Sequence, residues 1–363
     1  MHLRHLCATR VKINLVKILV RGTNWVGDAV MTIPALHELR RLFPDARITL
    51  HTRSWAEGIF RDAALFDEIL IFDKTRSKIK DALTQAKELK KHEFDLAVLF
   101  PNSFETALVA KMSKIPRRFG YSKEGRSFLL TNAIEIPIWK NERHEVYYYL
   151  NLVAEIEQEY FAKKTVLEND PHIDLAVSAE RKIEARKILE ENGVDLSKKI
   201  VALGVGSTNS RAKRWPAASY AKLNNLLQIE LNANVVLVGA KDEAEVSDEV
   251  FAKSEKKPII LTGKTNLAQI VAVLAKTDLL VSNDMGLAHI ASAIGTKTIV
   301  IFGPTNEKTT QPIGSEIIRK RVDCAPCMLR DCPIDHRCMT RISAEEVFEK
   351  AKLKLNSKIP GVG

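Results

Sequence analysis

The sequence predicts an α/β protein made of two Rossmann-like halves, each built on a parallel β-sheet. Short β-rich runs alternate with helix-length stretches, the alternation pauses near the middle of the chain, and it then restarts. Strands joined by helix-length connections form βαβ units, whose strands run parallel. The 363 residues are enough for two domains that each bury a core. We therefore expect two sheets that face a central cleft.

The first domain is expected over residues 1–170. Its first strand, at 17–21, is followed by a Gly-containing turn and an amphipathic stretch over 28–43, which Pro44 ends. Further strands of this domain are expected at 47–52, 68–72, 95–100, 117–121 and 133–136.

A region with few strand formers and many Glu, Lys and Ala residues lies at about 139–197 and is expected to connect the domains. It includes a helical pattern over 178–192 that ends at Gly193. The second domain is expected over 171–342, and a charged amphipathic helix begins the final segment, 343–363. The strands expected in the second domain are 200–205, 234–239, 258–262, 278–282 and 298–302.

The composition is that of a globular protein with a basic surplus. Its 55 Lys and Arg against 45 Asp and Glu give a net charge of +10, which favours polyanionic partners such as nucleotide phosphates, nucleic acid or an anionic membrane surface. No apolar run reaches the roughly 18–20 residues that a transmembrane helix needs. The N-terminal segment is basic, and we expect it to be an irregular stretch that leads into the first strand rather than a signal peptide. We therefore expect a cytoplasmic protein.

Three loops that follow predicted strands are candidates for chemistry, because ligands of open α/β sheets bind at the carboxyl ends of the strands. The first is RGTNWVGD, residues 21–28, which places Asp28 at the start of a helix, where the ionised carboxylate is favoured. An ionised Asp28 that faces a cleft can accept a proton from an attacking hydroxyl group. The alternative is that Asp28 only caps the helix.

The second loop, GVGSTNSRAKRWP at 204–216, combines hydroxyl groups with the cations Lys213 and Arg214. Backbone amides, hydroxyls and cations together can bind a diphosphate. A dinucleotide fingerprint would need Gly where Asn209 stands, and a Walker loop is also absent. A basic, solvated turn is the alternative.

The third loop, SNDMGLAH at 282–289, follows an apolar strand. Gly286 allows the backbone to approach a ligand closely, and the following helix directs its positive end at the loop. Asp284 and His289 are candidates for contacts to sugar or phosphate. For His289, a purely structural role is the alternative.

Five segments in this order resemble the lipopolysaccharide ADP-heptose heptosyltransferase family over residues 17–350. They are RGTNWVGDAVMTIPAL, FPNSFETALVAKMSKIPRRFGY, KRWP, SNDMGLAHIASAIGTKTIVIFGPT and the cysteine-containing segment near the C-terminus. The Trp-Val-Gly-Asp and Pro-Asn-Ser-Phe forms resemble heptosyltransferase II more than heptosyltransferase I. The resemblance implies a glycosyltransferase-B fold and an inverting transfer, without a required metal or cofactor, from ADP-L-glycero-D-manno-heptose to the heptosyl-Kdo2-lipid A inner core.

The resemblance also assigns roles to residues. It makes Asp28 the general base and Lys213 the cation that neutralises the donor diphosphate. The remaining donor contacts that it implies are Ser207, Thr208, Arg214, Glu243, Asp284, Met285, Gly286, Leu287 and His289, where Met285 stands in a place often held by a small hydroxyl residue. The acceptor contacts that it implies are Asn24, Trp25, Asn102, Ser103, Arg117 and Arg118.

Two further features leave alternatives open. Four cysteines with His336 among them have spacing typical of a zinc or iron–sulfur site, although the paired CxxC…CxxC of a zinc ribbon is absent. Free thiols are the alternative for this group, which consists of Cys324, Cys327, Cys332 and Cys338. The basic stretch 111–126 is either a solvated surface or a contact for the anionic acceptor.

Two other functions compete with this interpretation. One is a glycosyltransferase of the same fold with another nucleotide sugar or another core acceptor. The other is a metal-containing nucleic-acid-binding protein. Two observations argue against this function: the charges are dispersed along the sequence, and no nucleic-acid-binding module is recognised. We expect no nucleic-acid partner, a monomer, and peripheral contact with the inner membrane.

Overall fold

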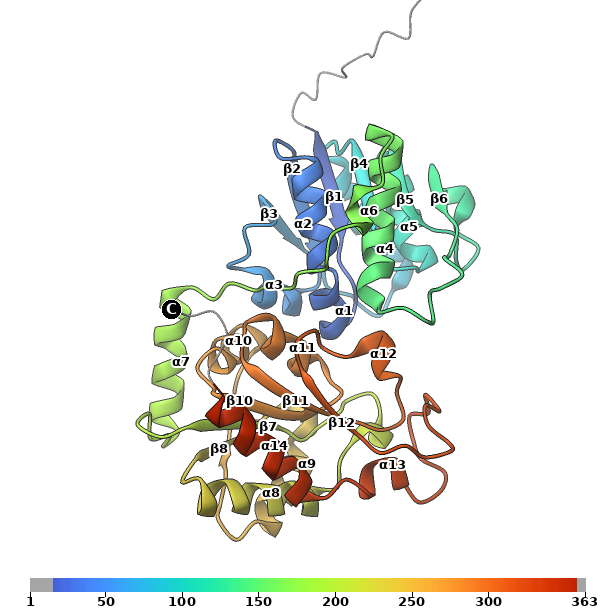
Figure 1. Cartoon of the computed structure of the whole chain (residues 1–363). Helices are drawn as coiled ribbons and strands as arrows, with labels where there is room; N and C mark the ends of the chain where they lie inside the picture. Colours follow the sequence, from blue (N-terminus) through green and yellow to red (C-terminus); the bar gives the residue numbers. More distant parts are fainter. Residues whose placement is uncertain (1–15, 358–363) are drawn as a thin grey trace, which may run out of the picture.

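A computed structural model describes residues 16–357 of the chain. The irregular start expected before the first strand and the end of the final segment lie outside the described residues. Two six-stranded sheets, all of whose strand pairs are parallel, form the two halves (Figure 1). The predicted fold class, with two Rossmann-like halves, is confirmed.

The first sheet has the order β3-β2-β1-β4-β5-β6. Its strands are β1 (Lys17–Arg21), β2 (Arg47–Thr52), β3 (Glu68–Ile71), β4 (Leu96–Leu99), β5 (Arg117–Tyr121) and β6 (Asn132–Ile134). Its helices are α1 (Val26–Met31), α2 (Ile33–Leu42), α3 (Ser54–Phe60), α4 (Lys78–Lys90), α5 (Phe104–Met112) and α6 (Glu145–Phe161), with 3₁₀ turns at η1 (Ser127–Leu129) and η2 (Thr165–Leu167).

The second sheet has the order β12-β11-β10-β7-β8-β9. Its strands are β7 (Ile200–Gly204), β8 (Asn234–Val238), β9 (Ile259–Ile260), β10 (Leu279–Asn283), β11 (Lys297–Phe302) and β12 (Glu316–Arg319). Its helices are α7 (Ala179–Glu191), α8 (Ala217–Glu230), α9 (Ala244–Lys253), α10 (Leu267–Leu274), α11 (Gly286–Ala293), α12 (Glu307–Thr310), α13 (Arg337–Thr340) and α14 (Ala344–Asn356), with 3₁₀ turns at η3 (Arg211–Lys213) and η4 (Lys241–Glu243).

Helices cover both faces of each sheet, which explains why the central strands are apolar throughout. Every residue of β4 and of β7 is buried. Strands that are covered on both faces lack the alternation of polar and apolar residues seen in half-exposed strands. The sequence pattern of short continuous apolar runs therefore located these strands within one or two residues at most ends.

Two details of the sequence-based expectation differ from the structure. The stretch 28–43 forms two helices, α1 and α2, rather than one. Thr32 divides the two helices, and Pro34 near the start of α2 has no amide hydrogen to donate to the preceding turn. The edge strand β12, which pairs only with β11, was not predicted because its four residues begin and end with charged side chains.

The region at 139–197 holds two helices that belong to different halves. Helix α6 packs against α2 of the first half, whereas α7 packs against α10 of the second. The chain therefore crosses between the halves after α6 and before α7 (Figure 1). Helix α14 packs against α8 and the second sheet.

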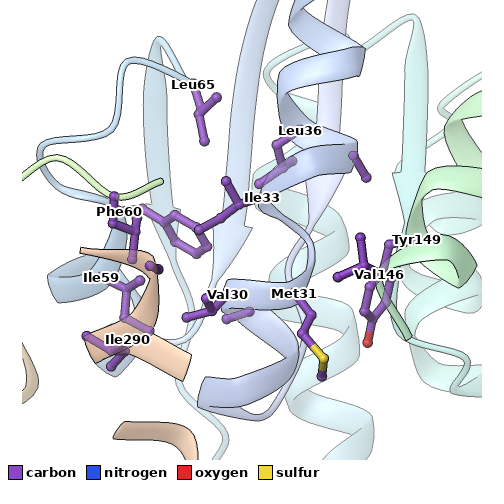
Figure 2. Close-up of a cluster of buried hydrophobic side chains, with 14 of the residues drawn as sticks. Val30, Met31, Ile33, Leu36, Ile59, Phe60, Leu65, Val146, Tyr149 and Ile290 are labelled. Carbon is purple, nitrogen blue, oxygen red and sulfur yellow. The ribbon is translucent and has the colours of Figure 1, made fainter. Parts of the chain in front are cut away.

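The two halves meet through helices that face each other. Helix α1 packs against α11, and α3 packs against α10. A single cluster of buried apolar side chains runs from the first half into the second, and Figure 2 shows Ile290 of α11 beside Ile59 of α3. At Gly58 the approach is so close that a Cβ atom would lie 2.7 Å from the backbone nitrogen of Ala268.

A buried arginine fixes this contact between the halves. Arg181 of α7 donates hydrogen bonds to the carboxylate of Asp62 at 2.8 Å and to the carbonyl of Gly58 at 3.0 Å, both in the first half. It also donates to the carbonyl of Ala268 in α10 at 2.6 Å. Because one guanidinium satisfies groups of both halves, it holds them in their observed arrangement.

Within residues 16–357, no helix is both long enough and apolar enough to span a bilayer.

Candidate active site

A cavity of about 910 Å³ lies between the two halves, at the carboxyl ends of β1, β7, β8 and β10. Parallel strands bring their carboxyl ends to one edge of a sheet, so the loops that follow them converge there. The predicted site residues that line this cavity are Asn24, Trp25, Asp28, Ser207, Thr208, Lys213, Glu243, Asp284, Met285, Gly286, Leu287 and His289. The three candidate loops, far apart in sequence, therefore form one site.

Two glycines allow the first and third loops to touch across the cleft. A Cβ atom on Gly286 would lie 2.6 Å from Cβ of Val26, a separation that real side chains do not adopt. A Cβ atom on Gly27 would lie 3.1 Å from the Cδ2 atom of His289. The loop after β1 and the start of α11 are thus in van der Waals contact, with no room for a side chain at Gly286 and little at Gly27.

Asp28 is not the cap of its helix. It lies in the first turn of α1, whose N-cap residue is Trp25, and its Oδ1 atom accepts a hydrogen bond from the hydroxyl of Tyr149 at 3.2 Å. Burial, together with the nearby charge of Glu145, raises the pKa of Asp28 to about 6, and the hydrogen bond from Tyr149 opposes the rise. A carboxylate with this pKa is ionised at neutral pH and is more basic than an exposed one.

Tyr149 was not found from the sequence. It lies in the second turn of α6, 121 residues from Asp28, and no motif surrounds it. Burial raises the pKa of the Tyr149 hydroxyl well above its ordinary value, so the group stays protonated and donates its hydrogen to Asp28.

An ion pair joins the second and third loops. The Nζ atom of Lys213 lies 2.7 Å from Oδ2 of Asp284, a buried carboxylate that also accepts a hydrogen bond from the hydroxyl of Thr305 at 2.7 Å. Thr305 follows β11 and was not predicted. Asp284 therefore holds the ammonium group of Lys213 in place and balances part of its charge.

Glu243 closes the cavity at the end of β8. Its carboxylate accepts hydrogen bonds from the backbone nitrogen of Ala240 at 2.9 Å and from the hydroxyl of Thr208 at 3.4 Å. Burial raises the pKa of Glu243. A Cβ atom on Gly206 would lie 2.2 Å from the carboxyl carbon, so this glycine lets the carboxylate sit against the backbone of the second loop.

The second loop is held by side chains that do not line the cavity. Arg214 donates hydrogen bonds to the carbonyl of Ser207 at 3.1 and 3.3 Å. Asn283, at the end of β10, donates to the carbonyls of Val205 and Gly206, both at 2.9 Å. The structure thus gives Arg214 a role in shaping the loop, and it identifies Asn283 as a supporting residue that the sequence did not indicate.

His289 is buried at the start of α11, beside Gly27. Burial lowers the pKa of its imidazole to about 4, so the ring is neutral at neutral pH. A neutral ring can donate one hydrogen bond and accept one, and it adds no positive charge to the cavity.

The predicted acceptor residues divide into two groups. Asn24 and Trp25 line the cavity, and Trp25 is 56% exposed. Asn102 and Ser103 do not line it. The amide of Asn102 donates to the hydroxyl of Tyr148 at 3.1 Å, and Ser103 caps α5.

The two predicted arginines also lie outside the cavity. Arg117 forms an ion pair with Glu159 at 3.2 Å. Arg118 donates a hydrogen bond to the carbonyl of Leu129 at 2.8 Å. Each guanidinium group therefore uses part of its hydrogen-bonding capacity on neighbouring protein atoms.

The four cysteines of the C-terminal segment are free thiols. Cys324 and Cys327 are exposed, Cys332 is half-buried and Cys338 is buried. In the part of the chain that the structure describes, no three His, Cys, Asp or Glu side chains are arranged to hold a metal ion.

Two Rossmann-like halves with a cavity at the carboxyl ends of both sheets form the architecture of the glycosyltransferase-B fold, and comparisons identify the family of the chain. The sequence profile of glycosyltransferase family 9 (heptosyltransferase) matches residues 83–337. The lipooligosaccharide heptosyltransferase 2 of Campylobacter jejuni subsp. jejuni serotype O:2 is 30% identical over 348 residues, which are 93% of this chain and 97% of that protein. The chain belongs to glycosyltransferase family 9.

Other relatives agree with this assignment. The lipopolysaccharide heptosyltransferase 2 of Escherichia coli K12 is 28% identical over 82% of this chain and 85% of its own length. The structure of the E. coli ADP-heptose lps heptosyltransferase II superimposes with a TM-score of 0.79 at 25% identity and covers 94% of this chain and 98% of that one. The resemblance inferred from the motifs is confirmed, and the protein is a glycosyltransferase.

Proposed function

We propose that this enzyme transfers heptose, with inversion, from ADP-L-glycero-D-manno-heptose to the lipopolysaccharide inner core, at the heptosyl-Kdo2-lipid A acceptor. The observation that carries the proposal is that Asp28 of one half and the Lys213–Asp284 pair of the other line the same cavity. The similarity to the E. coli ADP-heptose lps heptosyltransferase II supports the donor. The similarity to lipooligosaccharide and lipopolysaccharide heptosyltransferases 2 supports an acceptor of the lipopolysaccharide class.

Asp28 is the proposed general base. As the acceptor hydroxyl attacks the anomeric carbon, its oxygen forms the new glycosidic bond and its proton passes to the Asp28 carboxylate. The bond between the anomeric carbon and the diphosphate breaks, and the electron pair leaves with ADP. Attack from the face opposite the leaving group inverts the anomeric configuration.

Lys213 is the proposed partner of the departing diphosphate. Negative charge grows on that group as the bond breaks, and a cation that is already oriented stabilises it without reorganisation. Asp284, which accepts a hydrogen bond from Thr305, holds the ammonium group in position. The hydroxyls of Ser207 and Thr208 and the amides that begin α11 are further donors for the phosphate oxygens.

The remaining donor contacts follow from position in the cavity. We assign Glu243 to the ribose hydroxyls, because its carboxylate lies in the cavity wall at the end of β8. Met285, Leu287 and His289 line the wall nearest to α11. Met285 has no hydroxyl to offer, so phosphate contacts are expected from its neighbours instead.

The acceptor is proposed to approach past Asn24 and Trp25, from the first half. Four of the predicted acceptor residues lie outside the cavity and would contact only those parts of a large acceptor that extend beyond it. They are Asn102, Ser103, Arg117 and Arg118. Because the proposed acceptor carries a lipid anchor, we place the reaction at the cytoplasmic face of the inner membrane, with the enzyme acting as a monomer.

The test is transfer itself, with ADP-heptose compared against UDP, GDP and CMP sugars on defined inner-core acceptors. Product mass and released nucleotide report transfer, and NMR of the new linkage reports its anomeric configuration. The proposal predicts use of ADP-heptose, inversion, and an acceptor that already carries one heptose. A preference for a UDP sugar would contradict the proposed donor, and transfer to a heptose-free acceptor would contradict the proposed acceptor.

A further inference from the structure

The cysteine-containing segment, residues 323–338, contributes a cation to the wall of the cavity. Among residues 16–357, the lysine and arginine side chains that line the cavity are Lys213 and Arg330. Arg330 stands in the segment between Cys327 and Cys332, in a part of the sequence to which no substrate-binding role was assigned.

The charge of Lys213 is not fully available to a ligand. Its ammonium group pairs with Asp284 at 2.7 Å. The nearest cation in sequence, Arg214, turns its guanidinium to the carbonyl of Ser207. By contrast, Arg330 is exposed, and within the described residues it makes no ion pair with any carboxylate.

The backbone of Arg330 is fixed beside the loop that carries Lys213. The carbonyl of Arg330 accepts hydrogen bonds from the backbone nitrogen of Ala212 at 2.9 Å and from the hydroxyl of Ser210 at 3.2 Å. The Nε2 atom of His336 lies 2.6 Å from the carbonyl oxygen of Ala212. The segment is therefore tied at several points to the second loop, so the guanidinium of Arg330 projects from a backbone that is already held there.

The carboxylates of the cavity make a further cation necessary. Asp28, Glu243 and Asp284 all line it. A diphosphate carries at least two negative charges, and a single lysine already paired with Asp284 would leave it facing net negative charge. A guanidinium matches phosphate geometry because it can donate two parallel hydrogen bonds.

We propose that Arg330 binds the diphosphate of the nucleotide-sugar donor and so is a substrate-binding residue alongside Lys213. This inference rests on the proposed function, because it assumes a nucleoside diphosphate in the cavity. It gives the cysteine segment a role as one wall of the donor site.

The experiment compares ADP and adenosine binding by titration calorimetry in four proteins: wild type, Arg330→Ala, Arg330→Lys and Arg321→Ala. Loss of a charged hydrogen-bonding partner predicts that Arg330→Ala weakens ADP binding about tenfold or more, with adenosine binding unchanged. Arg330→Lys should recover part of the affinity. Arg321 is the matched control, because it is exposed, removes the same charge and does not line the cavity.

Several results would overturn the inference. Unchanged ADP affinity in Arg330→Ala would do so, as would an equal loss of ADP and adenosine affinity, which would indicate a structural role. In a transfer assay of the same variants, an increase in the acceptor KM alone would place Arg330 at the acceptor instead. If wild-type protein binds no ADP, the proposed donor fails as well, whereas ADP binding that Arg330→Ala leaves intact removes only this inference.

Discussion

The hydroxyl of Tyr149 lies 3.2 Å from Oδ1 of Asp28 and joins the second turn of α6 to the first turn of α1. Burial makes the charged form of Asp28 less favourable and raises its pKa to about 6, and the charge of Glu145 adds to the rise. The Tyr149 hydroxyl acts in the opposite direction, because its hydrogen bond stabilises the carboxylate. The basicity of Asp28 is therefore set by neighbours that can be changed one at a time.

Replacement of Tyr149 by Phe removes the hydrogen bond and should raise the pKa of Asp28 above about 6. A general base works only when ionised, so activity is lost as the pH falls through this pKa. The acidic limb of the profile of kcat/KM against pH should consequently move to higher pH. A limb that stays in place would show that Tyr149 does not tune the base.

Glu145→Gln should have the opposite effect on the same profile. The substitution removes a negative charge that raises the pKa of Asp28, so the acidic limb should move to lower pH. It also frees the ammonium group of Lys140, which pairs with Glu145 and itself lowers the pKa of Asp28. Shifts of the same sign in Glu145→Gln and Tyr149→Phe would contradict the electrostatic account.

The contact between the first and third loops predicts that a second substitution in one loop can restore activity lost through a substitution in the other. In Gly286→Ala the added Cβ atom would meet Cβ of Val26 at 2.6 Å, so the loops must separate and transfer should fall. Val26→Gly removes both Cβ and Cγ1, which would lie 2.6 and 2.7 Å from the added atom, and the double variant should recover part of the rate. Transfer rates of the two single variants and the double variant measure this coupling. Additive losses would mean that the two residues do not touch in the working enzyme.

Arg181→Ala should loosen the attachment of the two halves. It leaves the Asp62 carboxylate, which is 15% exposed, without its partner and removes the bonds to Gly58 and Ala268. Loss of one member of a largely buried ion pair destabilises a protein by about 3 kcal/mol. Urea denaturation measures the free energy of unfolding, and small-angle scattering should show a more open shape.

The control for this effect lies in the same helix. Arg186 pairs with Glu190 at the surface, and Arg186→Ala should change stability by less than about 1 kcal/mol. Equal effects of the two substitutions would remove the special role assigned to Arg181.

The loops of the site could be predicted because each directly follows an apolar strand, and the topology of parallel sheets brings such loops together. Asp28, Lys213 and Asp284 were identified in this way. The sequence could not show that Asp284 pairs with Lys213, since that contact depends on the spacing of β7 and β10 in the folded sheet.

Residues that support the site from other elements could not be predicted. Tyr149 stands in a stretch without a motif, and Thr305 ends the segment SNDMGLAHIASAIGTKTIVIFGPT, which assigns it no role. Only folding brings their hydroxyls to Asp28 and Asp284. Arg330 lies among cysteines whose spacing drew attention to metal binding instead. A local pattern carries no information about a contact made by the folded chain with a distant segment.

The most direct test of the account is the single-turnover rate of heptose transfer by Asp28→Asn at saturating ADP-heptose. The amide has nearly the same shape as the carboxylate and can still accept the hydrogen bond from Tyr149, so folding and donor binding should persist. Because an amide cannot take a proton from the acceptor, the rate should fall at least about 100-fold. Transfer near the wild-type rate would contradict the assignment of Asp28 as the base that works across the cleft.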